Sequence, residues 1–279
     1  MIFGKTQRFF YKNEVESDNS AGFPAGFSKG GTMFDFNADD SRYSHMPFAA
    51  YDGNGSPQEF CCIQRGGLWK LHWRKGDKWK RIQTGLPKDA TECGPTAEWE
   101  DGMWKVSFIA GGWKGDRRFR LYRMYGIDTT PMAQGFADVG FVRKDTVAMA
   151  ERRGPIVVKD AERTITLEIP GAMFLYRLSY DPQRPNRLLI SGETHGGDIF
   201  SWAYAPGMDE LVAITDGGTP AYKCAFWDGE CFYAERVKGF EERRIVRAEH
   251  LEYTHLEARK HVVETIEYGK NMNAPEEFE

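Results

Sequence analysis

Short runs of aromatic and β-branched residues, broken by turn-forming residues, follow one another along most of the chain. One stretch shows the pattern clearly, because Trp99–Phe108 places Asp101-Gly102 between two such runs. An Asp-Gly dipeptide flanked by apolar runs is a strong local indication of a β-hairpin. The same pattern returns in Phe226–Ala234, around Asp228-Gly229. The chain is therefore predicted to be built from antiparallel hairpins.

These hairpins group into five units of similar length. Their first turns fall roughly every 40–50 residues, at Asp52, Asp101, Asp145, Asn186 and Asp228. A glutamate that closes the second strand repeats about every 42 residues, as Glu151, Glu193 and Glu235. A period of about 40–45 residues carrying four short strands is typical of propeller blades. The predicted fold is all-β, a five-bladed β-propeller with four-stranded antiparallel blades, and a β-sandwich or an irregular barrel is the alternative.

The whole chain, 1–279, is predicted to form a single β-propeller domain. Residues 1–43 are expected to be an irregular N-terminal segment and residues 269–279 a tail. The blades are expected roughly over 44–90, 91–133, 134–170, 171–216 and 217–268. A propeller joins its first and last blades, so an outer strand of the last blade is expected from residues 256–268 or from residues 5–12. The pattern of residues 256–268 fits a helix or an outer strand.

Composition and charge limit the partners. Hydrophobic residues make up 41% and aromatic residues 14% of the chain, enough for a substantial core. The formal net charge is −4, and the most basic stretch, Arg74–Arg81, is interpreted as a solvated hairpin tip, so no nucleic acid partner is expected. No run is long enough to span a membrane, and Met1–Arg8 lacks the apolar core of a signal peptide. We expect a soluble, cytoplasmic protein without a membrane partner, and its oligomeric state stays open.

Cysteine and histidine usage gives no metal or redox motif. The five cysteines include no CxxC pair, and the six histidines show no ligand spacing. Cys61 and Cys62 are adjacent, so on a strand they would point to opposite faces. The cysteines are interpreted as small buried hydrophobic residues. We therefore predict no metal site and no cofactor.

The propeller topology selects two groups of residues that converge on one face of the ring, called the mouth below. The inner strand of each blade starts at the mouth, and the loop between the second and third strands returns to it. The strand starts are His45, Glu92, Asp138, Phe174 and Tyr222. The loops contribute Arg65, Trp113, Lys114, Glu151, Arg152, Glu193, His195, Glu235 and Arg236. The mouth is thus predicted to carry several carboxylates among arginines and aromatic rings.

Carboxylates that break the repeat are the stronger catalytic candidates, because structural residues follow the blade symmetry. Glu92 and Asp138 are not repeated in kind at equivalent positions, and Asp40 leads into the first blade. Paired carboxylates cleave glycosidic bonds, one as acid and one as base or nucleophile. Glu92, Asp138 and Asp40 are therefore the predicted catalytic residues. The predicted substrate-binding residues are Arg42, His45, Trp113, Glu151, Arg152, Glu193, His195, Tyr222 and Glu235.

The turn-then-aromatic pattern of Glu98–Phe108 resembles the blades of the five-bladed propeller glycosidases, which include arabinanases, xylosidases, invertases and levansucrases. Glu92-Cys93-Gly94-Pro95 is similar to the Glu-Cys-Pro element of the invertase-like branch, with one residue inserted. The resemblance implies that Glu92 is the proton donor and that Asp138 is a further acid. Those enzymes carry an aspartate at the start of the first blade, where this chain reads Ser44-His45-Met46-Pro47.

Different functional hypotheses follow from this pattern. The first is a carbohydrate-active, glycoside hydrolase-like protein with a carboxylate-lined central funnel. The second is a non-catalytic propeller that binds a glycan, a small molecule or a protein partner at the same mouth. A weaker third is a structural component of a larger assembly that uses the acidic tail Asn273–Glu279 as an extension. Propellers serve catalysis and binding alike, so the fold does not decide between the hypotheses.

Overall fold

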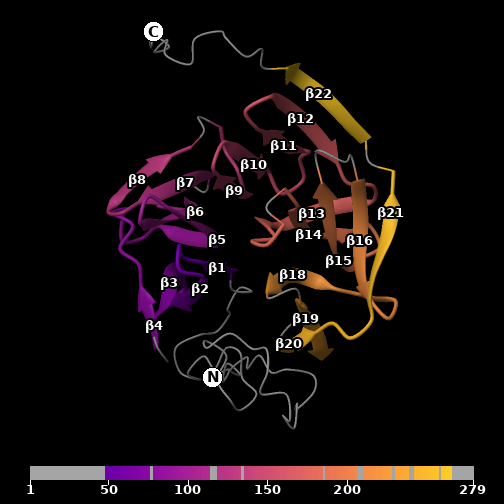
Figure 1. The fold of residues 1–279 in the computed structure, drawn as a ribbon, viewed down its shortest axis with the longest axis horizontal. Coiled ribbons are helices and arrows are strands. Elements are labelled where there is room, and N and C mark those ends of the chain that lie inside the picture. The colour runs from indigo at the N-terminus through magenta and orange to yellow at the C-terminus, as the bar shows by residue number, and fades with distance from the viewer. Residues whose placement is uncertain are drawn as a thin grey trace.

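The strands of this chain form a ring of five sheets. The computed structural model describes residues 48–75, 78–113, 118–132, 135–184, 186–205, 210–227, 230–238, 242–257 and 259–265. In these residues all regular structure is β-strand, and no helix occurs. Figure 1 shows the strands as five small antiparallel sheets arranged around a centre. The prediction of an all-β, five-bladed β-propeller is confirmed.

We number the sheets as blades 1 to 5 in chain order. Blade 1 contains β1 (Phe48–Tyr51), β2 (Pro57–Arg65), β3 (Leu68–Lys75) and β4 (Lys78–Arg81). Blade 2 contains β5 (Thr91–Glu100), β6 (Met103–Gly111), β7 (Phe119–Tyr125) and β8 (Asp128–Pro131). Blade 3 begins with β9 (Val139–Arg143), β10 (Thr146–Ala150), β11 (Ile156–Lys159) and β12 (Arg163–Glu168).

Blade 4 has the same meander and one short addition. It contains β13 (Ala172–Tyr180), β14 (Leu188–Thr194), β15 (Ile199–Ala205), β16 (Glu210–Asp216) and β17 (Thr219–Pro220). Blade 5 contains the strands β18 (Tyr222–Trp227), β19 (Glu230–Lys238) and β20 (Glu242–Arg247). The first strands of the blades, β1, β5, β9, β13 and β18, line the centre, and the contact between β18 and β1 closes the ring.

The Asp101-Gly102 hairpin forms as the sequence predicts. Glu100 pairs with Met103, so the two residues between them make the whole turn from β5 to β6. Asp101 has a φ of 53° and Gly102 a φ of 78°, which is the left-handed backbone that two-residue hairpin turns of this kind require. Aspartate and glycine tolerate this region better than other residues. Asp228-Gly229 lies outside the described residues.

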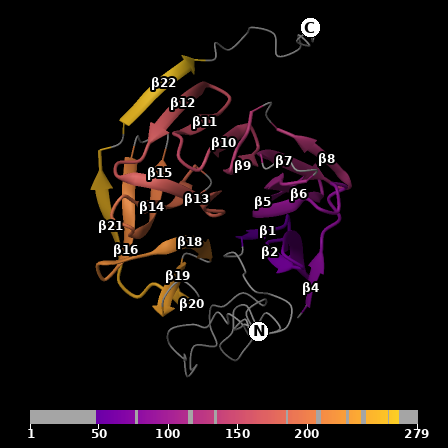
Figure 2. The same cartoon turned by 180° about the vertical axis from the view of Figure 1, so that it is seen from behind.

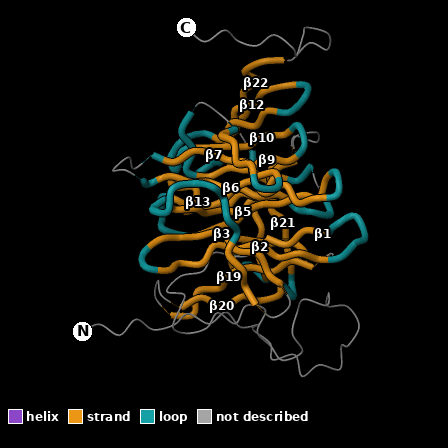
Figure 3. Tube along the Cα trace, turned by 90° about the vertical axis from the view of Figure 1, so that its left-hand side faces the viewer, coloured by secondary structure: helices purple, strands orange, loops and turns teal. Residues whose placement is uncertain are grey.

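Loops and turns gather on two opposite faces of the ring, as the side view in Figure 3 shows. On the mouth face, loops of one blade reach the next inner strand. The N–H of Leu175, on β13, donates to the carbonyl of Arg152 in the loop between β10 and β11, at 2.7 Å. This hydrogen bond joins blade 3 to blade 4 and fixes the loop beside the centre.

Tyr180, the last residue of β13, connects four blades at the face opposite the mouth. Its ring contacts Phe48 of blade 1 and Phe141 of blade 3, with centroid distances of 5.0 Å and 5.3 Å. Its hydroxyl donates to the carbonyl of Ala97 in blade 2 at 2.6 Å. Blades 1 and 2 are not neighbours of blade 4 in the ring, so this buried side chain reaches across the centre. Aromatic pairs of this kind add about 0.5–1.5 kcal/mol each beyond their buried area.

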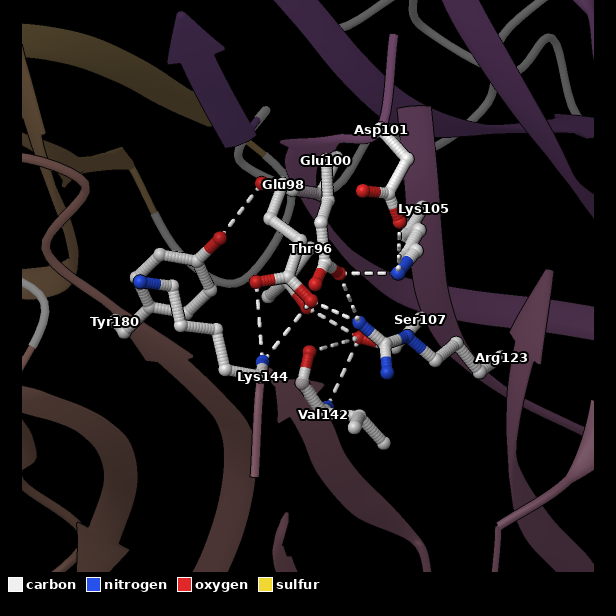
Figure 4. A network of polar contacts seen from close by, with 11 residues as sticks. Thr96, Glu98, Glu100, Asp101, Lys105, Ser107, Arg123, Val142, Lys144 and Tyr180 are labelled. Carbon is white, nitrogen blue, oxygen red and sulfur yellow. Dashed lines mark hydrogen bonds and ion pairs between the residues drawn. The ribbon is translucent and has the colours of Figure 1, made fainter. Parts of the chain in front are cut away.

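A polar network joins blade 2 to blade 3 (Figure 4). The carboxylate of Glu98 accepts the N–H of Lys144 at 3.0 Å and also bonds to the guanidinium of Arg123. The buried Ser107 hydroxyl accepts the N–H of Val142 at 3.0 Å and lies 3.1 Å from the carbonyl of the same residue. Side chains of one blade thus bind backbone groups of the next blade, and the buried N–H of Val142 would otherwise lack a partner.

The C-terminal strands run along the outside of blades 4 and 3. Beyond β20, β21 (Leu251–Leu256) pairs with β16, and β22 (Arg259–Thr265) pairs with β12. Figures 1 and 2 show both as yellow strands on the rim, and we call them the C-terminal clasp. The predicted outer strand for the last blade is therefore wrong for this segment, which covers earlier blades instead. Residues 5–12, the other predicted source, lie outside the described residues.

Hydrogen bonds fix the start of the clasp. One carboxylate oxygen of Asp216, at the end of β16, accepts the N–H groups of Glu249 and His250 at 3.1 Å and 2.7 Å. The carboxylate of Glu252 accepts the N–H of Gly218 at 3.2 Å. The clasp then covers the outer edges of β16 and β12, which removes two exposed sheet edges.

One carboxylate is buried inside blade 1. Glu59 on β2 is 4% exposed and accepts a hydrogen bond from Arg74 at 3.3 Å. Its other oxygen makes no hydrogen bond within the described part of the chain. Burial raises the pKa of Glu59 to about 7, although the charge of Arg74 lowers it. The protonated carboxyl is therefore the form that the fold favours.

A chain that ends at His250 lacks the clasp and is expected to unfold at a lower temperature. The Tm should fall by at least about 5 °C, which is a loss of roughly 2 kcal/mol in a domain of this size. Calorimetry measures the difference, and a chain that ends at Thr265 keeps both strands and serves as the control. Equal Tm values for the two truncated chains would show that the clasp contributes nothing to stability.

Glu59→Gln is expected to remove a pH dependence of stability. Because the folded-state pKa lies above the ordinary value, the contribution of Glu59 is fully present below about pH 4.5 and is lost as the pH rises through about 7. Between pH 5 and pH 8 the wild type should lose about 2 kcal/mol of unfolding free energy relative to Glu59→Gln. Urea unfolding of both proteins at pH 5 and at pH 8 measures this. The same difference in unfolding free energy between wild type and variant at both pH values would contradict the prediction.

Candidate functional site

A cavity of about 310 Å³ lies at the centre of the ring. It is lined by residues of all five blades, mostly from the inner strands β5, β9, β13 and β18. Its charged side chains are Asp138, Arg152, Arg177 and Lys223. Its aromatic side chains are Trp69, Phe119 and Tyr176. Among the described residues, three cations and one carboxylate therefore surround this space.

β-Bulges interrupt three inner strands where they border the cavity. The pairing of β5 shifts between Cys93 and Thr96, that of β13 between Leu175 and Arg177, and that of β18 between Tyr222 and Ala225. A bulge places two residues opposite one and re-aims the chain locally. The cavity-lining residues Gly94, Tyr176 and Lys223 lie within these three bulges.

Lys223 adopts an unfavourable backbone conformation at its bulge. Its φ is 54°, close to the 61° of Gly94 at the corresponding place in blade 2. Glycine adopts this conformation freely, whereas a residue with a Cβ loses about 1–2 kcal/mol. Lys223 is also 5% exposed, with its ammonium 5.1 Å from the ring centroid of Tyr222. Strained residues of this kind concentrate at functional sites, so Lys223 is a candidate binding residue.

Arg177 is the second buried cation of the cavity. It is 4% exposed, and burial lowers the pKa of its guanidinium to about 10, so the group stays charged at neutral pH. The Cys93 thiol lies close enough to Asp138, Arg152 and Lys223 to feel all three charges, and burial raises the pKa of Cys93 to about 12. The thiol is therefore protonated at neutral pH and is a poor nucleophile.

The structure brings together two of the predicted site residues directly. Asp138 and Arg152 both line the cavity, and the carboxylate of Asp138 accepts the backbone N–H of Arg152 at 2.8 Å. Two other predicted site residues, Glu193 and Tyr222, contact the cavity-lining residue Tyr176. Glu193 accepts a hydrogen bond from the Tyr176 hydroxyl, and the buried ring of Tyr222 meets the Tyr176 ring edge-on at 6.2 Å.

Glu92 does not line the cavity. Its carboxylate is fully buried and accepts the N–H of Leu71 and the hydroxyl of Thr84, both at 2.9 Å. The Lys70 ammonium lies 3.7 Å away. These partners all lie in or just after blade 1, whereas Glu92 starts blade 2, so the carboxylate joins the two blades. The catalytic role of Glu92 stays a prediction, whereas its contacts indicate a structural role in joining blades 1 and 2.

Other predicted residues lie away from the cavity or outside the described part of the chain. Glu151 and His195 are exposed on mouth loops, and Trp113 packs against Tyr122 with ring centroids 6.3 Å apart. None of these three lines the cavity. Asp40, Arg42, His45 and Lys114 lie outside the described residues, as do the side chains of Arg65, Glu235 and Arg236.

No protein-family model matches this chain, and no curated protein matches it. The likeness to propeller glycosidases therefore rests on the blade pattern and on Glu92–Pro95 alone. Within the described strands, no group of three or more His, Cys, Asp or Glu side chains is placed to hold a metal ion. The same residues contain no helix that is long and apolar enough to cross a membrane.

Sequence reasoning missed the two buried cations of the cavity. Arg177 and Lys223 each stand alone in an apolar inner strand, as Phe174-Leu175-Tyr176-Arg177-Leu178 and Tyr222-Lys223-Cys224-Ala225 show. A single cation within a run that packs into a core is costly to bury unless it is paired or hydrogen-bonded, so its presence there indicates a specific role. That rule applied to the predicted inner strands would have selected both residues.

Glu92→Gln is expected to destabilise the fold. The substitution removes the charge beside the buried Lys70 and one strong acceptor, so the free energy of unfolding should fall by about 2–4 kcal/mol. Urea unfolding measures the loss, and the exposed Glu151→Gln serves as the control with little expected change. A Glu92→Gln protein as stable as the wild type would contradict the structural role.

Proposed function

We propose that the central cavity binds a small acidic carbohydrate. The observation that supports this most is the charge of the lining, which contains Arg152, Arg177 and Lys223, with Asp138 as the one carboxylate among the described residues. The chain as a whole carries a net charge of −4, so this cationic lining is a local feature. Arginine and lysine form charge-assisted hydrogen bonds with carboxylates that are roughly twice as strong as neutral ones.

The remaining lining suits a sugar ring. Trp69, Phe119 and Tyr176 offer aromatic surface, and Thr91 and Asp138 offer hydrogen-bonding groups for hydroxyls. The volume of about 310 Å³ lies at the low end of small-molecule sites, which span about 300–1,000 Å³. The cavity therefore suits one sugar unit better than a protein segment.

Binding is better supported than hydrolysis. Glycoside hydrolases place two carboxyl groups about 5–9.5 Å apart across the scissile bond, both in contact with the substrate. The described lining contains one carboxylate, that of Asp138, and therefore lacks the second carboxyl group of such a pair. The carboxylate of Glu92 is enclosed between blades 1 and 2. A hydrolase-like reaction would use Asp138 as its acid or base, and Asp138→Asn would then abolish glycosidase activity while sparing binding of the sugar acid.

Lys223→Gly is expected to weaken binding without harming the fold. Glycine suits the φ of 54° at this position, so the variant should be at least as stable as the wild type. Loss of the ammonium should reduce the affinity for galacturonate by about tenfold or more, equivalent to roughly 1.4 kcal/mol. Isothermal titration measures galacturonate binding, with galactose as the neutral sugar for comparison.

Lys144→Gly provides the matched control for this experiment. Lys144 has a φ of 45° but lies on an exposed turn at the face opposite the mouth. The control should relieve a similar backbone strain and leave galacturonate binding unchanged. The proposal is contradicted if the wild type binds galactose as tightly as galacturonate, or if Lys223→Gly retains wild-type affinity.

A further inference from the structure

A second cavity of about 210 Å³ adjoins the central one on the mouth side of blades 3 and 4. The two cavities share Arg152 and Leu175 in their linings. The shared wall is held in place, because the Leu175 N–H donates to the Arg152 carbonyl at 2.7 Å and the Arg152 N–H donates to Asp138 at 2.8 Å. The two spaces are therefore fixed neighbours on either side of one loop segment.

The second cavity is also cationic. Its lining contains Arg152 and Arg153, with Glu168 as the one carboxylate among the described residues. The guanidinium of Arg153 lies 4.5 Å from the ring centroid of Phe174 on β13, so the ring restricts its position. Ile156 and Leu167 add apolar surface to the same space. Charge and apolar surface thus recur here in the combination that the central cavity shows.

We infer that the ligand is an acidic oligosaccharide that occupies both cavities, with one uronate unit in each. This inference rests on the proposed function, because the first unit is the sugar acid of the central cavity. Arg152 borders both spaces, so it is placed between the two acidic groups of adjacent units, and Arg153 binds the second group. A neutral oligosaccharide would offer no anionic group to the cations of either cavity, and one with a single charged unit would offer such a group to one cavity and not to the other.

Isothermal titration with galacturonate and with α-1,4-linked digalacturonate tests the inference on the full-length protein. The wild type should bind the dimer at least tenfold more tightly than the monomer, because the second unit adds contacts without a second loss of rigid-body freedom. In Arg153→Gln the ratio of the two dissociation constants should fall to about two or less. In Glu168→Gln, which removes the opposing carboxylate, the ratio should rise.

Arg184→Gln is the matched control, because Arg184 is exposed in the turn after β13 at the face opposite the mouth. It should keep both dissociation constants of the wild type. Equal wild-type affinities for monomer and dimer would overturn the two-cavity inference and leave the proposed function intact. An unchanged ratio in both Arg153→Gln and Glu168→Gln would also overturn it. If neither sugar acid binds, both proposals fail.

Discussion

The ring depends on contacts that cross its centre, and Tyr180 makes two of them, to Phe48 and to Ala97. Its ring packs on Phe48 and Phe141, and its hydroxyl bonds to Ala97, so one side chain of blade 4 holds three other blades. Neighbouring blades are then joined by buried polar groups that satisfy backbone donors of the next sheet, as Ser107 does for Val142. Tyr180 thus packs at the end of β13 that is opposite the mouth, while the central cavity lies toward the mouth, beside Thr91, Asp138 and Arg152.

That space is shaped by departures from regular strand geometry. Bulges interrupt β5, β13 and β18 at residues that line the cavity, and at one of them the chain places a buried lysine in a conformation that glycine adopts without strain. A structural role alone would be filled better by glycine, as Gly94 shows at the corresponding bulge of blade 2. We therefore attribute the lysine at this position to its charge, in line with the cationic lining around it.

The repeat of turn residues was sufficient to predict the number and type of blades, because two-residue turns and strand lengths are local properties. Asp101-Gly102 and the return of loops to one mouth are found as predicted. Pairing between segments far apart in sequence was not predictable in this way. In the clasp, β22 pairs with β12, which lies roughly one hundred residues earlier in the chain. The carboxylate of Glu92 accepts hydrogen bonds from Leu71 and Thr84 and does not line the cavity. The bulges beside Arg177 and Lys223 were not predictable from the local pattern either, although an isolated cation in an apolar strand marks both residues in the sequence.

The central claim is that the ring binds an acidic sugar through the cations at its centre. A crystal structure of the protein with galacturonate tests it most directly. The account predicts the sugar in the central cavity, with its carboxylate about 2.7–3.2 Å from a nitrogen of Arg152, Arg177 or Lys223. A sugar bound elsewhere on the surface, or one in the cavity with its carboxylate turned away from all three cations, would contradict it.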